Sequence, residues 1–183
     1  GKYLCMIDAD DWIYPWKLER QVAIMEVHPE LAVLSTGMAI INSEQEIVGV
    51  RIAGAGEQNL TVFPPLSTPA HPRLAFAPSM LRMTVAKQYW FDSTFAIAED
   101  KDYLLHILLN HVSAVMRDVL YVYSEIDSIT LNKITRSYRN NRKMFLKYRK
   151  SAGFFIYHHI IILLLKEVIY RVLFGMGYGE QII

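Results

Sequence analysis

A short apolar run that stops at a cluster of aspartates is the feature that most constrains how this chain folds. Residues 3–7 read Tyr-Leu-Cys-Met-Ile and are followed at once by Asp8, Asp10 and Asp11. A continuous apolar run of this length is typical of a strand buried on both faces, as in a parallel sheet. Ligands of open α/β sheets bind just beyond the carboxyl ends of such strands. The sequence therefore predicts a strand over 3–7 with a polar site at its end.

The aspartate cluster by itself is open to two interpretations. Three carboxylates so close together repel one another unless a cation or a hydrogen-bond donor compensates their charge. Mg²⁺ and Mn²⁺ take oxygen ligands, commonly one or two carboxylates together with substrate phosphates. Aspartate also favours turns and helix N-caps, so the same residues are compatible with a simple turn before a helix.

The rest of the chain alternates between strand and helix patterns, which indicates an α/β sheet. After Pro15, apolar residues at helical spacing predict a helix that ends at His28-Pro29. Residues 54–78 hold five of the seven prolines and are predicted to form a loop. Further strands are predicted over 31–41, 46–52 and 112–124, and further helices over 83–89, 102–111, 132–150 and 154–174.

Composition narrows the class of protein. A length of 183 residues, 52% hydrophobic and 20% charged, is typical of one folded domain and argues against disorder. Cys5 is the only cysteine, so no internal disulfide is possible and a reducing compartment is favoured. The sequence shows no signal-peptide pattern, and we expect a cytoplasmic protein. The formal net charge of +1 does not indicate a nucleic-acid partner, and none is expected.

Residues 1–21 closely resemble the central segment of family 2 glycosyltransferases, in which a strand ends in Asp-x-Asp and Trp-x-x-Pro-x-Lys-Leu follows. Residues 91–95 and 98–104 resemble the family's Phe-Asp-x-x-Phe and Glu-Asp-x-Asp motifs, and residues 78–82 resemble the segment before its acceptor region. The resemblance extends to about residue 130. In the first segment the matching residues are Asp8, Asp10, Asp11, Trp12, Pro15, Lys17, Leu18 and Gln21.

This resemblance implies a GT-A fold and a donor site for a nucleotide-diphospho-sugar. Asp10 would coordinate a divalent cation, Mn²⁺ or Mg²⁺, that bridges the diphosphate of the donor. Asp8 would assist the metal or lie at the ribose, and Asp11 would be a neighbouring substrate-binding residue.

The resemblance also implies an acceptor site. Asp100 would be the catalytic base that takes the proton of the attacking hydroxyl group, and Glu99 would help to hold the acceptor. Arg82, in the segment before the acceptor region, would be a substrate-binding residue. One base on the face opposite the leaving group implies transfer with inversion.

Two departures from the family pattern qualify these expectations. Many members carry Tyr-Arg-x-His-x-x-Ser after the last core strand, whereas residues 122–130 contain neither the arginine nor the histidine. No role of that histidine is therefore carried over. The family's base- and ribose-binding strands would precede Gly1, so we expect a domain that lacks its first βαβ units and is inactive as a fragment.

Residues 131–183 are predicted to form a helical extension to the catalytic portion, residues 1–130. Between Lys133 and Lys150 the sequence has eight basic residues and no acidic one, and an apolar segment follows. Its uncharged part, residues 154–165, is shorter than the roughly 20 predominantly apolar residues that a transmembrane helix needs. On a helical projection one apolar arc stands opposite most of the charges, as in an interfacial helix near anionic lipid, although packing on this or a partner domain is the alternative. The arc consists of Tyr157, Ile161, Leu164, Leu165, Val168 and Val172.

The function predicted from these features is metal-dependent transfer of a sugar to a saccharide or lipid-linked acceptor in cell-surface polysaccharide or glycolipid synthesis. The enzyme would act in the cytoplasm, peripherally at the inner face of the membrane through residues 133–174. One alternative is a Mg²⁺-dependent nucleotidyltransferase, which would release pyrophosphate and leave Asp100 without a role. Another is a catalytically empty module that docks on membranes.

Overall fold

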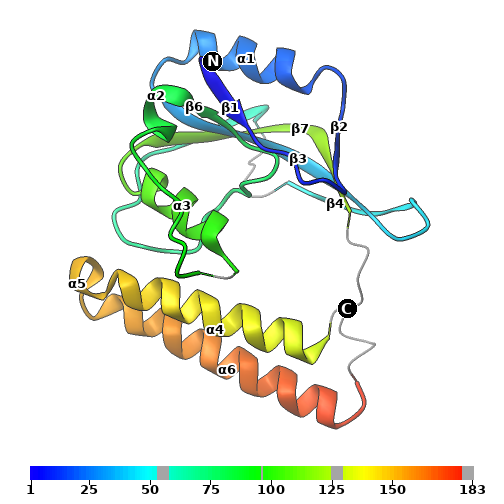
Figure 1. Ribbon diagram of the computed structural model, residues 1–183, viewed down its shortest axis with the longest axis vertical. Helices are drawn as coiled ribbons and strands as arrows, with labels where there is room; N and C mark the ends of the chain where they lie inside the picture. The colour runs from blue at the N-terminus through cyan, green and yellow to red at the C-terminus, as the bar shows by residue number, and fades with distance from the viewer. Residues whose placement is uncertain (53–57, 96, 125–129, 179–183) are drawn as a thin grey trace.

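The computed structural model describes residues 1–52, 58–95, 97–124 and 130–178. In this part of the chain a seven-stranded sheet has helices on both sides (Figure 1). The strands are β1 (Tyr3–Cys5), β2 (Trp12–Ile13), β3 (Leu31–Ile41), β4 (Ile47–Arg51), β5 (Leu60–Phe63), β6 (Met80–Arg82) and β7 (Val112–Ser124). The helices are α1 (Lys17–Val27), α2 (Met83–Ala86), α3 (Glu99–Leu108), α4 (Leu131–Lys147), α5 (Arg149–Ala152) and α6 (Phe155–Gly175).

Two long strands form the centre of the sheet. β3 and β7 run parallel to each other, and the strand order is β1-β6-β3-β7-β2. β4 pairs with β3 and β5 pairs with β7, both antiparallel. Every residue of β3 is buried, including Ser35 and Thr36 between its two apolar ends, as is typical of a central strand covered on both faces. The predictions for residues 31–41 and 112–124 are confirmed to the residue.

The prediction for the first strand was wrong in part. β1 ends at Cys5, and it pairs antiparallel with β6 instead of forming a buried parallel strand. In the described part of the chain β1 pairs with no strand other than β6, and the three residues of β1 are half-buried. Met6 and Ile7, which were predicted to continue the strand, are exposed. They form the approach to the turn that holds the aspartates.

Other elements differ from the prediction in ways that affect the site. β5 lies inside the segment 54–78, which was predicted to be a loop, so that prediction was wrong for these four residues. β6 follows this segment and β2 follows the aspartate cluster, and neither strand was predicted. These strands have two to four residues, too few to show a period in the sequence. The helix predicted from Asp102 begins at Glu99, so Glu99 and Asp100 lie in its first turn. The helix predicted over 132–150 is divided into α4 and α5.

The helices cover the two faces of the sheet in layers. α1 packs on one face, where Met25 joins a core cluster with Leu34. α3 covers the opposite face, where Leu104 packs in a cluster with Val33 and Val115. α4 and α6 run antiparallel below α3, farthest from α1, and we call this pair with the short α5 the helical hairpin (Figure 1).

The helical hairpin is attached to the sheet domain through α3. Leu105 of α3 belongs to the same buried cluster as Met144 and Phe145 of α4 and Ile156 and Leu163 of α6. Phe145 is fully buried at the centre of this contact. The helix that carries Glu99 and Asp100 is therefore held between the sheet and the hairpin.

Candidate functional site

The aspartate cluster forms a turn directly after β1. The backbone N–H of Asp11 donates to the carbonyl oxygen of Asp8 at 3.2 Å, which closes the turn. Asp8 and Asp10 are exposed and Asp11 is half-buried. The turn therefore presents two carboxylates to solvent and directs the third towards the protein.

Asp11 anchors this turn to the end of β7. Its carboxylate accepts a hydrogen bond from the hydroxyl group of Tyr121 at 2.6 Å and another from the backbone N–H of Ser124 at 2.9 Å. Burial and the bond to this carboxylate raise the pKa of Tyr121 well above its usual range, so the phenol remains a donor. Both oxygens of Asp11 thus have protein partners, whereas the predicted substrate-binding role stays a prediction.

Two other residues of the first motif are buried in the fold. The ammonium group of Lys17 donates to the side-chain oxygen of Gln21 at 2.8 Å, and burial lowers the pKa of Lys17. The amide of Gln21 in turn donates to the carbonyl oxygens of Leu34 and Pro78, at 2.8 and 3.1 Å. These contacts join α1 to β3 and to the segment before β6, and they give Lys17 and Gln21 a structural role.

The second motif lies at the start of α3. Glu99 is exposed and Asp100 is half-buried, both in the first turn of the helix. The preceding residue, Ala98, has a left-handed backbone with φ of 75°, which is uncommon for a residue with a side chain. Carboxylates in a first helical turn are stabilised by the positive end of the helix dipole.

The fold brings the two acidic motifs to one cavity. Asp8 and Asp100 line a cavity of about 350 Å³ together with Glu99, Phe76 and Phe91. Partial burial raises the pKa of Asp8, and so do the negative charges of its acidic neighbours, Asp100 among them. Two carboxylates that are far apart in the sequence therefore repel each other across one hollow in the protein surface.

A neighbouring cavity of about 460 Å³ shares Asp8 and Asp100 and adds basic side chains to the site. Arg51 at the end of β4 and Lys101 in α3 line it. His71 lines it too, but burial lowers the pKa of this imidazole to about 4, so it is neutral at pH 7. The sequence contained no motif that would single out these residues. Only the folded chain shows them beside the two acids.

Asp10 faces a different hollow. It lines a cavity of about 390 Å³ with Asp11, Trp12 and residues of the β3–β4 turn, among them Ser43 and Gln45. Among the described residues, no group of three histidine, cysteine or acidic side chains is arranged to hold a metal ion by itself. The hard oxygen donors available at this turn are the exposed carboxylates of Asp8 and Asp10.

Arg82 lies at the opposite end of β1 from the aspartate turn, because it pairs with Tyr3 in the sheet. Its guanidinium group donates to the carbonyl oxygens of Met25, His28 and Leu31, at 2.8, 3.1 and 2.9 Å. These carbonyl groups belong to the end of α1 and the start of β3, so the contacts are structural. The predicted substrate-binding role of Arg82 stays a prediction, and its position gives no support to it.

Sequence reasoning missed Lys147, which ties the helical hairpin to the second motif. Its ammonium group contacts Asp102 at 2.6 Å and Asp92 at 2.9 Å. Asp102 is fully buried and also accepts a hydrogen bond from the hydroxyl group of Tyr148 at 2.9 Å. Hydrogen bonds from Thr94 and then from Lys147 hold the pKa of Asp92 well below its usual range. The last acid of the Glu-Asp-x-Asp motif is therefore an anchor for α4.

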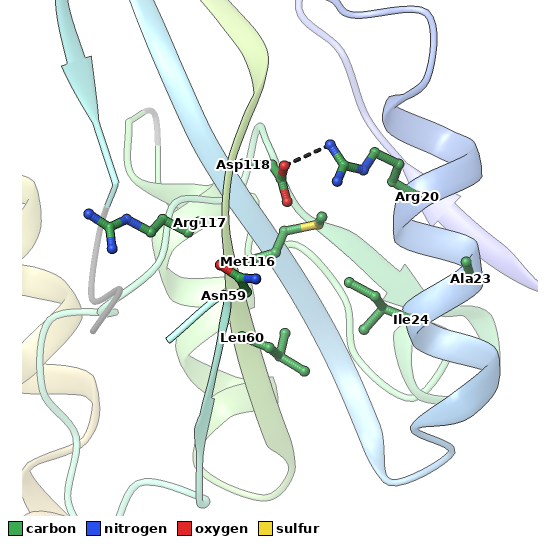
Figure 2. Close-up of a pocket in the computed structure, with 8 residues that line it drawn as sticks. All are labelled: Arg20, Ala23, Ile24, Asn59, Leu60, Met116, Arg117 and Asp118. Atoms are coloured by element: carbon green, nitrogen blue, oxygen red, sulfur yellow. Dashed lines mark ion pairs between the residues drawn. The ribbon is translucent and has the colours of Figure 1, made fainter. Parts of the chain in front are cut away.

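A further cavity, of about 490 Å³, lies on the other side of the sheet between α1 and the β5–β7 pair. Figure 2 shows Arg20 of α1 facing Asp118 of β7, and their side chains form an ion pair at 2.7 Å. Ile24 and Leu60 supply apolar walls. None of the predicted site residues lines this cavity, which separates it from the acidic site.

Comparison with known proteins shows the fold. No family model and no curated protein matches the chain. Among solved structures, that of Staphylococcus aureus TarS residues 1–349 in complex with UDP is similar, with a TM-score of 0.54 and 16% sequence identity. The match covers 94% of this chain and 47% of TarS 1–349, so the chain spans about half the length of that structure. TarS is a glycosyltransferase, and the chain therefore has a glycosyltransferase-like mixed α/β fold.

Proposed function

We propose that this chain carries the catalytic acids of an enzyme that transfers a sugar from a nucleotide-diphosphate donor to a hydroxyl group. The observation that carries the proposal is the cavity shared by Asp8 and Asp100, because it unites two motifs that resemble those of family 2 glycosyltransferases. Similarity to the fold of TarS, whose structure was solved with UDP, supports the nucleotide part of the proposal.

Asp100 is the proposed catalytic base. A hydroxyl group has a high pKa, so a carboxylate must take its proton as the new bond forms, which contributes about 10²–10⁴-fold to the rate. Asp100 is half-buried in the wall of the cavity, and Glu99 lines the same cavity, where we propose that it holds the acceptor. A single base opposite the leaving group gives single displacement with inversion at the sugar carbon.

Asp10 and Asp8 are the residues that would hold a divalent cation, Mn²⁺ or Mg²⁺. Two exposed carboxylates fit an ion that keeps several waters and takes its remaining ligands from substrate phosphates. The pKa of Asp8 is raised first by burial and then by repulsion from Asp11, Asp10 and Asp100, and a bound cation would relieve this repulsion. When bound, the ion would neutralise charge on the departing nucleotide diphosphate.

We propose that Arg51 and Lys101, which line the cavity of about 460 Å³, bind the diphosphate of the donor through their positive charges. Both line it together with Asp8 and Asp100. A diphosphate carries several negative charges, which the acids of the site would repel without cationic side chains or a metal nearby. In this chain these two residues would supply positive charge in place of the arginine and histidine missing from the family pattern.

The acceptor is proposed to be a saccharide or a lipid-linked saccharide, as in cell-surface polysaccharide or glycolipid synthesis. The test uses the full-length gene product that contains these residues, incubated with a panel of nucleotide-diphospho-sugars, Mn²⁺ and candidate acceptors. We expect release of the nucleoside diphosphate and a product with inverted anomeric configuration. Release of pyrophosphate would instead identify a nucleotidyltransferase, and no turnover of any nucleotide sugar would contradict the proposal.

A further inference from the structure

Helix α6 carries an apolar face that no described part of the chain covers. The side of α6 that carries Ile156 and Leu163 is buried against α4. The opposite side contains the arc that the helical projection predicted, together with Ile169, which was not part of that prediction. These side chains are between 42% and 58% exposed: Tyr157, Ile161, Leu164, Leu165, Val168, Ile169 and Val172. A contiguous exposed apolar surface on a folded protein normally marks a binding site, so we expect this side of α6 to have a partner.

The helical hairpin that carries this apolar face is strongly basic. Residues 131–178 contain ten lysines and arginines and a single acidic residue, Glu167. Glu167 is buried and its carboxylate is paired with Arg142 at 2.6 Å and with Arg171 at 2.8 Å. Residues 1–130 have the opposite balance, with nine basic and sixteen acidic residues. The net charge of +1 is therefore the sum of two opposite charges: residues 1–130, which we call the sheet domain, are acidic, and the helical hairpin is strongly basic.

We propose that the exposed face of α6 docks on the surface of an anionic lipid bilayer, with the helix lying in the plane of the interface. An apolar helix face flanked by lysine and arginine binds such surfaces through buried apolar area and electrostatic attraction. Within the described ranges, the structure has no helix long and apolar enough to cross a bilayer.

A second copy of the chain is a poorer partner for this face. A symmetric contact through α6 would bring two hairpins together, each with ten basic residues and one acid that is already paired. Like charges placed around an interface oppose association, whereas an anionic leaflet attracts each of them. Charge complementarity therefore favours the bilayer.

The layered fold would set the orientation on the membrane. α6 lies on the far side of the hairpin from the sheet, and α1 is on the opposite side of the molecule (Figure 1). Docking through α6 would leave the acidic sheet domain facing away from the anionic surface. The proposal does not rest on the proposed sugar transfer, so the two can fail separately.

Vesicle binding of the complete chain tests the proposal. We expect co-sedimentation with vesicles of phosphatidylcholine mixed with phosphatidylglycerol and little binding to phosphatidylcholine alone. Raising NaCl from about 0.1 M to about 1 M, which shortens the Debye length from about 10 Å to about 3 Å, should weaken binding. The triple substitution Ile161→Gln, Leu165→Gln and Val168→Gln should lower the affinity about tenfold or more, because it removes apolar area from the face.

A matched triple substitution on the sheet domain serves as the control. Ile47, Val48 and Val50 of β4 are 56–63% exposed, similar to the α6 positions, and their change to glutamine should leave vesicle binding unaltered. Circular dichroism checks that each variant is folded, and light scattering records its oligomeric state. A wild-type dimer that the α6 substitutions convert to a monomer, or a monomer that binds neither kind of vesicle, would overturn the proposal.

Discussion

At the scale of single residues, Asp100 has the clearest expected effect. Asp100→Asn keeps the size of the side chain in the first turn of α3 but removes the base from the cavity. We expect kcat to fall by about 10²-fold or more with little change in donor affinity, because a base acts in the transition state. Steady-state kinetics of the full-length protein measure this, with Asp118→Asn on the α1 side of the sheet as the matched control. A collapse of donor affinity with kcat preserved would make Asp100 a binding residue instead.

We expect Asp10 to contribute to cation binding and not to the stability of the fold. Its side chain is exposed, so Asp10→Asn should leave the thermal midpoint within a few degrees of the wild-type value. The same substitution should abolish transfer that depends on Mn²⁺ or Mg²⁺, since it removes one of two proposed oxygen ligands. Activity assays with each cation and with a chelator check the prediction. Full activity of the variant, or of the wild-type protein in chelator, would contradict the metal assignment.

The sequence identified the acids of the site but not how their roles divide. Asp8, Asp10 and Asp100 were found because they stand in motifs, and the fold brings Asp8 and Asp100 to one cavity. Asp11 and Asp102 stand in the same motifs, yet their carboxylates bind protein groups. Their partners, Tyr121 for Asp11 and Lys147 for Asp102, lie far away in the sequence. Such partners become visible only when the chain is folded.

At the scale of elements, length decided which strands could be predicted. β3 and β7 are long segments of 11 and 13 residues, rich in apolar and β-branched side chains, and the sequence indicated both correctly. β2, β5 and β6 are short, and the strands they pair with fix them more than their own pattern does. The start of α3 was misplaced for a related reason. Its N-cap, Ala98, offers no capping side chain, so the sequence contained no start signal before Glu99.

The contact between α3 and the helical hairpin should depend on Lys147. Among the residues that the structure describes, Lys147→Met would leave the hydroxyl group of Tyr148 as the remaining side-chain partner of the buried Asp102. We expect the free energy of unfolding to fall by about 3 kcal/mol. This value is at the lower end of the range for breaking a buried ion pair, because Lys147 is partly exposed. Urea denaturation measures it. Lys143→Met, an exposed position of the same helix, is the control and should change little.

The stability difference between the wild-type protein and Lys147→Met should also depend on pH. The pKa of Asp92 is lowered, first by hydrogen bonds from Thr94 and then by Lys147, from an ordinary value of 3.8. A carboxyl group with a lowered pKa stabilises the fold above its unfolded value, and this contribution is lost as the pH falls through the folded value. Thr94 still lowers the pKa of Asp92 in Lys147→Met, so the difference should be full at neutral pH and narrow only where the pH, already below 3.8, falls from the folded pKa of the variant to that of the wild type. NMR titration of Asp92 in both folded proteins checks this, and equal pKa values would show that Lys147 contributes nothing to the low pKa of Asp92.

At the scale of the whole molecule, the two kinds of charge lie in different layers of the fold: acidic residues dominate residues 1–130 and basic residues dominate the helical hairpin. The hairpin holds ten of the nineteen basic residues, and it packs on α3 beneath the sheet. The sequence showed the basic block and the apolar arc, and the structure confirms that the arc lies outside the core. What the sequence did not show is that the hairpin is joined to the acidic motif through Lys147. These contacts anchor the hairpin to the helix that carries Asp100.

The last prediction concerns how the 183-residue chain binds donors by itself. Asp8 and Asp10 are exposed, and the other charged groups proposed for the diphosphate, Arg51 and Lys101, are exposed too. Contacts between solvent-exposed charges are weakened by water and salt, and each contributes little. The chain also spans only about half the length of the TarS structure that was solved with UDP. We therefore expect dissociation constants of about 1 mM or weaker for nucleotide sugars with Mn²⁺, which corresponds to a binding free energy of about −4 kcal/mol. Titration calorimetry with several nucleotide sugars measures this, and micromolar binding would show that these 183 residues hold a complete donor site.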